Sequence, residues 1–146
     1  MPTELDRSLP LFAYGTLMFP EVISAVVGRA PVGLAAEIAG YRNCAVKDHS
    51  FPGLLYAGEG IVTGVLYPGL SLTEWAKLDA FEDDFYRLQK VEVMTEGKPR
   101  AALAYIVPPE NADVLTQETW DAEAFRRDLL PRYMSGTVSL YRSTEL

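Results

Sequence analysis

Turn-forming residues divide most of this chain into short apolar segments, and their spacing restricts the fold more than any other feature. Between residues 32 and 107, glycine or proline ends most apolar runs before they exceed the length of a strand. Several runs face each other across a turn signal, and strands do not alternate with helices as they do in a parallel α/β sheet. The pattern predicts an α+β fold with about six or seven short strands in a mainly antiparallel sheet able to close on itself, and about three helices.

The expected elements follow from these turn signals and from the periodicity of the apolar residues. An apolar strand begins at Leu11 and stops at Gly15, and a second extended segment, 32–46, is bent at Gly40. Gly58-Glu59-Gly60 and Gly97-Lys98-Pro99 predict two hairpins, and residues 71–74 have the pattern of a capping box. The remaining expected segments are strands 54–57, 61–67, 85–96 and 100–107, helices 20–27, 72–80 and 120–132 with Pro131 splitting or ending the last, and a polar connection over 108–119.

Composition and charge exclude several classes of protein. The chain has 146 residues, 49% of them apolar and 23% charged, which is typical of one folded domain spanning 1–146. A net charge of −7 without a basic cluster argues against a nucleic acid partner. One cysteine and one histidine cannot supply a zinc-type ligand set, so no metal is expected. Without a secretion signal or an apolar run of roughly 20 residues, we expect a cytoplasmic protein that does not enter a membrane.

The stretch 11–18, Leu-Phe-Ala-Tyr-Gly-Thr-Leu-Met, is the first candidate for a binding function. Gly15 ends its apolar run, and Pro20 begins a helix a few residues later. A glycine at the exit of a strand lets the backbone turn so that neighbouring amide N–H groups point toward a ligand. An ordinary turn between a strand and a helix uses the same residue types, so this stretch alone leaves both interpretations open.

The second candidate is the acidic stretch 78–87, Leu-Asp-Ala-Phe-Glu-Asp-Asp-Phe-Tyr-Arg, where a helix passes into a strand. Glu82 directly follows Phe81, whose ring we expect to face the core. A carboxyl group at the rim of the core would have a raised pKa and would be a useful base near neutral pH. A run of solvated surface charges is the alternative interpretation.

Other residues are weaker candidates for chemistry. His49 lies beside Ser50, but no neighbouring residue completes a catalytic triad. Cys44, in an expected strand, is typical of a small core residue. Glycine loops of the dinucleotide-binding and phosphate-binding types are missing from the sequence, which leaves acid–base chemistry by one carboxyl group.

Three groups of residues together resemble the gamma-glutamylcyclotransferase-like superfamily. They are Phe-Ala-Tyr-Gly-Thr-Leu at 12–17, Tyr41-Arg42 followed by Phe-Pro-Gly-Leu-Leu at 51–55, and Leu-Asp-Ala-Phe-Glu-Asp at 78–83. The resemblance covers about residues 10–107, and it is closest to the plant avirulence-induced-gene branch and the gamma-glutamylamine cyclotransferases. The helix expected from about residue 119 is similar to the C-terminal extension of the plant branch. The resemblance implies a small, mainly antiparallel β-barrel flanked by helices.

The resemblance also implies an activity and a site. Such enzymes cyclise a γ-glutamyl amide or peptide to 5-oxoproline and release an amine or amino acid, with neither a cofactor nor a metal. The implied role of Glu82 is general acid/base catalysis, and loop amides would hold the α-carboxylate of the substrate. The residues implied to contact the substrate are Tyr14, Gly15, Thr16, Leu17, Tyr86 and Tyr105.

Arg87 departs from the pattern of similar sequences. They often have an arginine two positions after the tyrosine that matches Tyr86, whereas here Arg87 follows directly and Leu88 occupies the usual position. A shift of one residue in a strand moves a side chain to the opposite face. The substrate contact credited to that arginine is therefore not carried over to Arg87.

Two other functions are compatible with the same scaffold. One is a non-catalytic module that binds a small acidic or amide ligand, and the other is a different amide-processing acyltransferase or hydrolase. The reaction product separates them: a lactam, a hydrolysis product, or no product despite a ligand-induced rise in melting temperature. The sequence does not reveal the leaving group or the oligomeric state.

Overall fold

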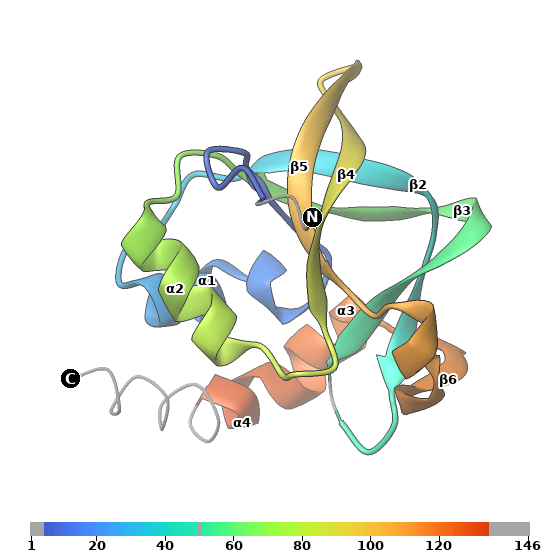
Figure 1. Ribbon diagram of the computed structural model, residues 1–146. Coiled ribbons are helices and arrows are strands. Elements are labelled where there is room, and N and C mark those ends of the chain that lie inside the picture. Colours follow the sequence, from blue (N-terminus) through green and yellow to red (C-terminus); the bar gives the residue numbers. More distant parts are fainter. Residues whose placement is uncertain (1–4, 50, 135–146) are drawn as a thin grey trace.

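Five strands of the computed structural model, which describes residues 5–49 and 51–134, close into a small barrel with helices beside it (Figure 1). The pairs β1–β3, β3–β2, β2–β4 and β4–β5 are antiparallel, and a parallel pairing of Leu11 in β1 with Leu103 in β5 completes the ring. The predicted α+β fold with a mainly antiparallel barrel is confirmed. The strands of the ring are β1 (Leu11–Ala13), β2 (Leu34–Val46), β3 (Pro52–Tyr67), β4 (Arg87–Thr95) and β5 (Lys98–Ile106).

Strands β2 and β3 are long and bend together at glycines. Ala39 pairs with Ile61 and Tyr41 pairs with Tyr56, so Gly40 alone lies opposite residues 57–60 of β3. The bend expected at Gly40 is confirmed, with a φ of 88° that favours glycine. The hairpin expected at 58–60 is wrong, because the segments on both sides of these glycines pair with β2 and form one strand of 16 residues. The glycines form a bulge that curves the barrel wall and do not form a turn.

The hairpin expected between β4 and β5 is confirmed, with its turn one residue earlier than predicted. The turn residues are Glu96 and Gly97, with φ of 53° and 76°. Positive φ at both central positions matches the right-handed twist of the flanking strands. Lys98 and Pro99 therefore belong to β5, where they pair with residues of β4.

Alternation along residues 11–14 creates two separate cores. Phe12 and Tyr14 belong to the cluster inside the barrel. Leu11 and Ala13 pack instead against α1 (Pro20–Val27) and α2 (Leu72–Phe81) in a second cluster, and Figure 1 shows both helices on the same side of the barrel. Because both of its faces are buried, β1 is a continuous apolar run. The helices expected at 20–27 and 72–80 are confirmed, and α2 extends one residue further.

The N-terminal end of α2 is fixed by the predicted capping box. The Glu74 N–H donates to Ser71 Oγ at 3.1 Å, and the Ser71 N–H donates to Glu74 Oε1 at 2.9 Å. Arg29, just beyond α1, donates to both oxygens of the same carboxylate, at 2.5 Å from Nε and 3.0 Å from Nη2. The buried Glu74 therefore joins the two helices and sets the position of α2, whose other end carries Glu82.

The segment after β5 is more regular than expected. The predicted polar connection is wrong, because it contains a 3-10 helix (Pro109–Val114) and strand β6 (Leu115–Thr119), which pairs with β2. The expected C-terminal helix begins as α3 (Ala122–Ala124), widens into a π-helical segment (Phe125–Leu129) and continues as α4 (Leu130–Tyr133). Pro131 therefore neither splits nor ends it, since the wider π turn ahead of the proline accommodates the missing N–H. None of the helices in the described part of the chain is long and apolar enough to cross a membrane.

Candidate functional site

The first candidate stretch forms a buried loop against the start of β3. Residues Thr16–Met18 make one 3-10 turn, and Gly15, Thr16 and Leu17 are all buried. A Cβ atom on Gly15 would lie 2.8 Å from Cγ of Pro52, so any other residue would push the loop and β3 apart. Among the described residues, none accepts a hydrogen bond from the amides of Gly15, Thr16 or Leu17. The loop therefore offers three backbone donors to a ligand.

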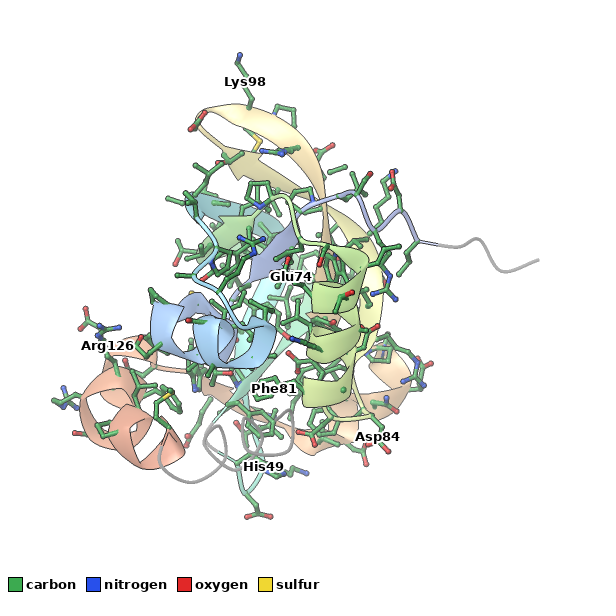
Figure 2. All side chains as sticks on the ribbon, turned by 90° about the vertical axis from the view of Figure 1, so that its left-hand side faces the viewer. His49, Glu74, Phe81, Asp84, Lys98 and Arg126 are labelled. Carbon is green, nitrogen blue, oxygen red and sulfur yellow. The ribbon has the colours of Figure 1, made fainter. Side chains whose placement is uncertain are left out.

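Glu82 is the residue that ends α2, at the opposite end of this helix from Glu74. Figure 2 shows Phe81, its neighbour in sequence, near the lower end of α2. Glu82 is half-buried, and burial raises the pKa of its carboxyl group to about 8, with the charges of Asp83 and then Asp79 acting in the same direction. The negative end of the helix dipole also disfavours the ionised form here. The half-buried position and the raised pKa of Glu82 agree with the carboxyl group expected at the rim of the core.

Two tyrosines connect Glu82 to the loop. The buried Tyr14 hydroxyl donates to the main-chain carbonyl of Tyr105, and burial followed by the charge of Glu82 raises the pKa of Tyr14. The Tyr105 hydroxyl donates to Asp79 Oδ1 at 2.7 Å. Burial and this hydrogen bond hold the pKa of Tyr105 well above its usual range, and Glu82 adds to the effect. Both phenols are therefore protonated hydrogen-bond donors at neutral pH.

Asp79 lies one helical turn before Glu82 and binds the N-terminal segment. Arg7 Nη1 is 3.1 Å from Asp79 Oδ2, and the Arg7 carbonyl accepts a 2.9 Å hydrogen bond from Trp75 Nε1. Arg7 thus balances the charge of Asp79. Within the described residues, Glu82 has no cationic partner of its own.

Tyr86 lies on the side of the loop where Pro52 packs. Its hydroxyl donates to the carbonyl of Pro52 at 2.5 Å, and Pro52 is the residue that contacts Gly15. The ring of Phe51 lies 6.5 Å from that of Tyr86 and stacks on His49, with 4.6 Å between the latter two ring centroids. In Figure 2, His49 lies below the end of α2 that carries Glu82. A series of aromatic contacts therefore extends from Tyr86, beside the loop, through Phe51 to His49.

The structure brings the predicted site residues to one end of the barrel and leaves Arg87 outside the group. Arg87 is exposed, and its guanidinium donates to the carbonyls of Asp84 and Tyr86 at 3.2 and 3.3 Å. Leu88 packs against the core under the helices. The one-residue shift thus puts Arg87 and Leu88 on opposite faces of β4, as expected, and Arg87 is exposed at the start of the strand. The residues brought together are Tyr14, Gly15, Thr16, Leu17, Glu82, Tyr86 and Tyr105.

Reasoning from the sequence missed the residues that hold this group in place. Asp79 lies in the last turn of α2 and Glu82 directly follows the helix, so the two carboxyl groups are about one helical turn apart, a spacing that was an available signal. Asn43 donates from Nδ2 to the carbonyl of Tyr14 at 3.1 Å, and the Tyr67 hydroxyl donates to the carbonyl of Leu17 at 2.9 Å. Both lie in strands, where an isolated polar residue is a weak signal for a buried hydrogen bond.

A separate cleft of about 300 Å³ lies between the bend of β2 and β3 and the segment that follows β6. Asn43 and Met18 line it, whereas Glu82 does not. The cleft is therefore distinct from the region around Glu82, although Asn43 contacts both the cleft and the loop.

Comparisons with known proteins identify a family and similar folds. A family model described as "Gamma-glutamyl cyclotransferase, AIG2-like" matches residues 11–122. AIG2-like protein C of Arabidopsis thaliana is 29% identical over 137 residues, which cover 93% of this chain and 80% of that protein. A solution structure of another A. thaliana protein has a TM-score of 0.69 at 20% identity and covers 99% of this chain and 88% of its own. A yeast gamma-glutamyl cyclotransferase specific to glutathione has a similar fold, with a TM-score of 0.59 at 16% identity over 76% of this chain and 73% of its own.

Proposed function

Because this chain belongs to the AIG2-like gamma-glutamyl cyclotransferase family, we propose that it cyclises a γ-glutamyl amide or peptide to 5-oxoproline. The observation that carries the proposal is the surroundings of Glu82. Its carboxyl group has a pKa of about 8 and has no cationic partner among the described residues. Its charge also raises the pKa of Tyr14. Tyr14 directly precedes the loop whose three amides have no acceptor among the described residues. These are the properties that a proton carrier beside an anion-binding loop requires.

The loop would hold the α-carboxylate of the substrate. The backbone amides of Gly15, Thr16 and Leu17 are suited to an anion because successive N–H groups can donate hydrogen bonds to the same carboxylate from a fixed backbone. Tyr86 and Tyr105 would form walls around the γ-glutamyl group. With the carboxylate held in this way, the α-ammonium group of the substrate would face Glu82.

Glu82 would then move protons between the two nitrogen atoms of the reaction. It accepts a proton from the α-ammonium, and the resulting amine attacks the γ-carbonyl carbon. The new C–N bond closes a five-membered lactam while the bond from the γ-carbon to the leaving nitrogen breaks. The attacking nitrogen loses two protons overall and the leaving nitrogen gains two, so Glu82 returns to its starting state and the products are 5-oxoproline and a free amine or amino acid.

The raised pKa of Glu82 suits this task. A carboxyl group of ordinary acidity would accept a proton from an ammonium group poorly, whereas a pKa of about 8 is close to that of an α-amino group. The nucleophile belongs to the substrate, so the protein mainly has to hold a reactive conformer. Such positioning can lower a barrier by roughly 7 to 11 kcal/mol at best.

The test is to incubate the purified protein with a panel of γ-glutamyl dipeptides and γ-glutamylamines and to assay 5-oxoproline. Wild type should release 5-oxoproline from at least one member of the panel. Glu82→Gln keeps the shape of the side chain but cannot carry a proton, so the reaction should be lost. Glu92→Gln makes the same chemical change at an exposed position of β4 and should behave as wild type.

Each result leads to a different conclusion. Equal turnover by wild type and Glu82→Gln would exclude Glu82 as the proton carrier. Release of glutamate in place of 5-oxoproline would indicate a hydrolase. A folded protein that turns over no member of the panel, but whose melting temperature rises with one of them, would be a binding module.

A further inference from the structure

Every carbonyl oxygen of the loop from Tyr14 to Met18 has a hydrogen-bond donor within 3.2 Å. Those of Gly15 and Thr16 accept from the backbone amides of Met18 and Phe19, at 2.9 and 3.2 Å. Those of Tyr14 and Leu17 accept from the side chains of Asn43 and Tyr67, and the oxygen of Met18 lies 3.2 Å from the same Tyr67 hydroxyl. The acceptors of the loop thus have donors beside them, while three of its amide donors have no acceptor among the residues that the structure describes. The loop is therefore suited to bind a ligand as a hydrogen-bond donor.

Asn43 of β2 holds the first of these carbonyls. The side-chain Nδ2 of Asn43 donates to the main-chain oxygen of Tyr14 at 3.1 Å. The main-chain carbonyl of Asn43 accepts from the main-chain N–H of Trp120 at 3.0 Å. Only the nitrogen end of the side chain can donate to a carbonyl, so the orientation of the amide group is determined. Its Oδ1 atom is consequently buried with no hydrogen-bond partner among the described residues. Such an orphaned acceptor is costly, so Asn43 is a poor choice for stability alone.

Tyr67 of β3 holds the other end of the loop. Its hydroxyl donates to the Leu17 carbonyl at 2.9 Å and lies 3.2 Å from that of Met18. Tyr67 is almost completely buried, and burial followed by the charge of Glu21 raises its pKa to about 12. The hydroxyl therefore remains a donor throughout the neutral pH range.

We propose that Asn43 and Tyr67 are positioning residues, which hold the carbonyl groups at the two ends of the loop and thereby turn the amides of Gly15, Thr16 and Leu17 toward the substrate. The Tyr14 oxygen shares a peptide plane with the Gly15 amide, so Asn43 directly opposes a rotation that would exchange this amide for a carbonyl at the site. The Leu17 oxygen shares its plane with the Met18 amide, which donates to the Gly15 carbonyl, so Tyr67 acts through this bond on the plane that carries the Thr16 amide. The inference rests on the proposed function, because it assumes that the loop binds the substrate carboxylate.

The test combines steady-state kinetics with an activity-independent measurement on Asn43→Leu and Tyr67→Phe. Residual dipolar couplings from NMR report the orientation of individual N–H bonds. In both variants the couplings of the three loop amides should change, while those of β2 and β3 should not. KM should rise about tenfold with kcat within about twofold, since the carboxylate contact is made equally in the ground and transition states. Tyr56→Phe removes an exposed hydroxyl from the same strand as Tyr67 and is the matched control.

The melting temperature separates positioning from a structural role. Asn43→Leu removes the orphaned Oδ1 acceptor but leaves the Tyr14 carbonyl without its donor, so these two effects oppose each other and the melting temperature should stay close to that of wild type although KM rises. Unchanged couplings and KM in both variants would overturn the proposal, whatever their stability. If Asn43→Leu does not fold, Tyr67→Phe decides the matter, because it removes a single oxygen atom. If wild type makes no 5-oxoproline, the proposed function fails, and the couplings still show whether the two side chains orient the loop.

Discussion

The two ends of α2 each carry a glutamate, and the two carboxyl groups have opposite surroundings. At the N-terminal end, Glu74 accepts hydrogen bonds from Arg29 and from the Ser71 amide, and these bonds lower its pKa. At the C-terminal end, burial of Glu82 and the negative charges of Asp83 and Asp79 raise its pKa to about 8. The helix dipole favours an anion at the first position and disfavours one at the second.

The difference teaches which of the two carboxyl groups is available for chemistry. A carboxylate with all its partners supplied by the protein contributes to stability and has no capacity left for a ligand. A carboxyl group with a raised pKa is a cost to the folded state whenever it ionises, and such costs are typical of functional sites. Glu74 therefore holds the helix, and Glu82 is the group that a substrate would complete.

The largest expected effect comes from making the same substitution at both ends. Glu82→Gln should reduce kcat by roughly 10² to 10⁴, the usual contribution of a general acid/base, without loss of folding. Glu74→Gln should do the reverse: the free energy of unfolding should fall by about 1–2 kcal/mol because the charged hydrogen bonds to Arg29 are lost, with kcat within about twofold of wild type. Denaturant unfolding and the 5-oxoproline assay on both variants measure this. A loss of activity in the folded Glu74→Gln protein as large as in Glu82→Gln would remove the distinction between the two ends.

The pH dependence of stability should also differ in sign. The pKa of Glu82 is higher in the folded state than its ordinary value of 4.5, so its contribution to stability is complete below pH 4.5 and is lost as pH rises toward 8. The pKa of Glu74 is lower in the folded state, so its contribution is present above pH 4.5 and is lost as pH falls below that value.

Glu82→Gln should therefore gain stability relative to wild type as pH rises from 4.5 to about 8, by about 1 kcal/mol per pH unit, and the difference should level off above that range. Denaturation curves of the two proteins across this range give the slope. A constant difference between them would mean that the pKa of Glu82 is the same in the folded and unfolded states.

A smaller effect is expected from the neighbours of Glu82. After burial, the charge of Asp83 is the largest cause of the raised pKa, and Asp83 is exposed. Asp83→Asn should therefore move the alkaline rise of kcat/KM to lower pH, by roughly 0.5 pH unit, without affecting the fold. Asp84→Asn changes the next residue, which is not among the causes of the shift, and should leave the profile in place. Equal profiles for wild type and Asp83→Asn would show that Glu82 does not control the pH dependence.

Much of the fold could be predicted because its signals are local. The capping box at Ser71, the bend at Gly40 and the helix that begins at Pro20 each depend on a few neighbouring residues, and all three are present. The hairpin at 58–60 was wrong because positive-φ glycines suit a bulge and a turn equally, and the choice depends on the partner strand. Strand β6 was missed because four of its five residues are polar and its partner, β2, lies far away in the sequence.

Some site residues could likewise be identified from local sequence, and others could not. Glu82 and the Gly15 loop were identified from the residue types in two short stretches and from the family resemblance. Asn43 and Tyr67 could not be identified in this way, because their hydrogen bonds to the loop join residues that are 29 and 50 positions apart in the sequence. Such contacts exist only once the barrel has closed.

The most direct test of the role assigned to Glu82 is its own titration. Carbon-13 NMR of the glutamate carboxyl groups, followed from about pH 3 to about pH 10, gives a midpoint for each residue, and Glu82→Gln and Glu74→Gln identify the two signals. Glu82 should titrate at about 8 and Glu74 below 4.5. A midpoint for Glu82 near 4.5 would contradict the account, because the two ends of α2 would then carry equivalent carboxyl groups.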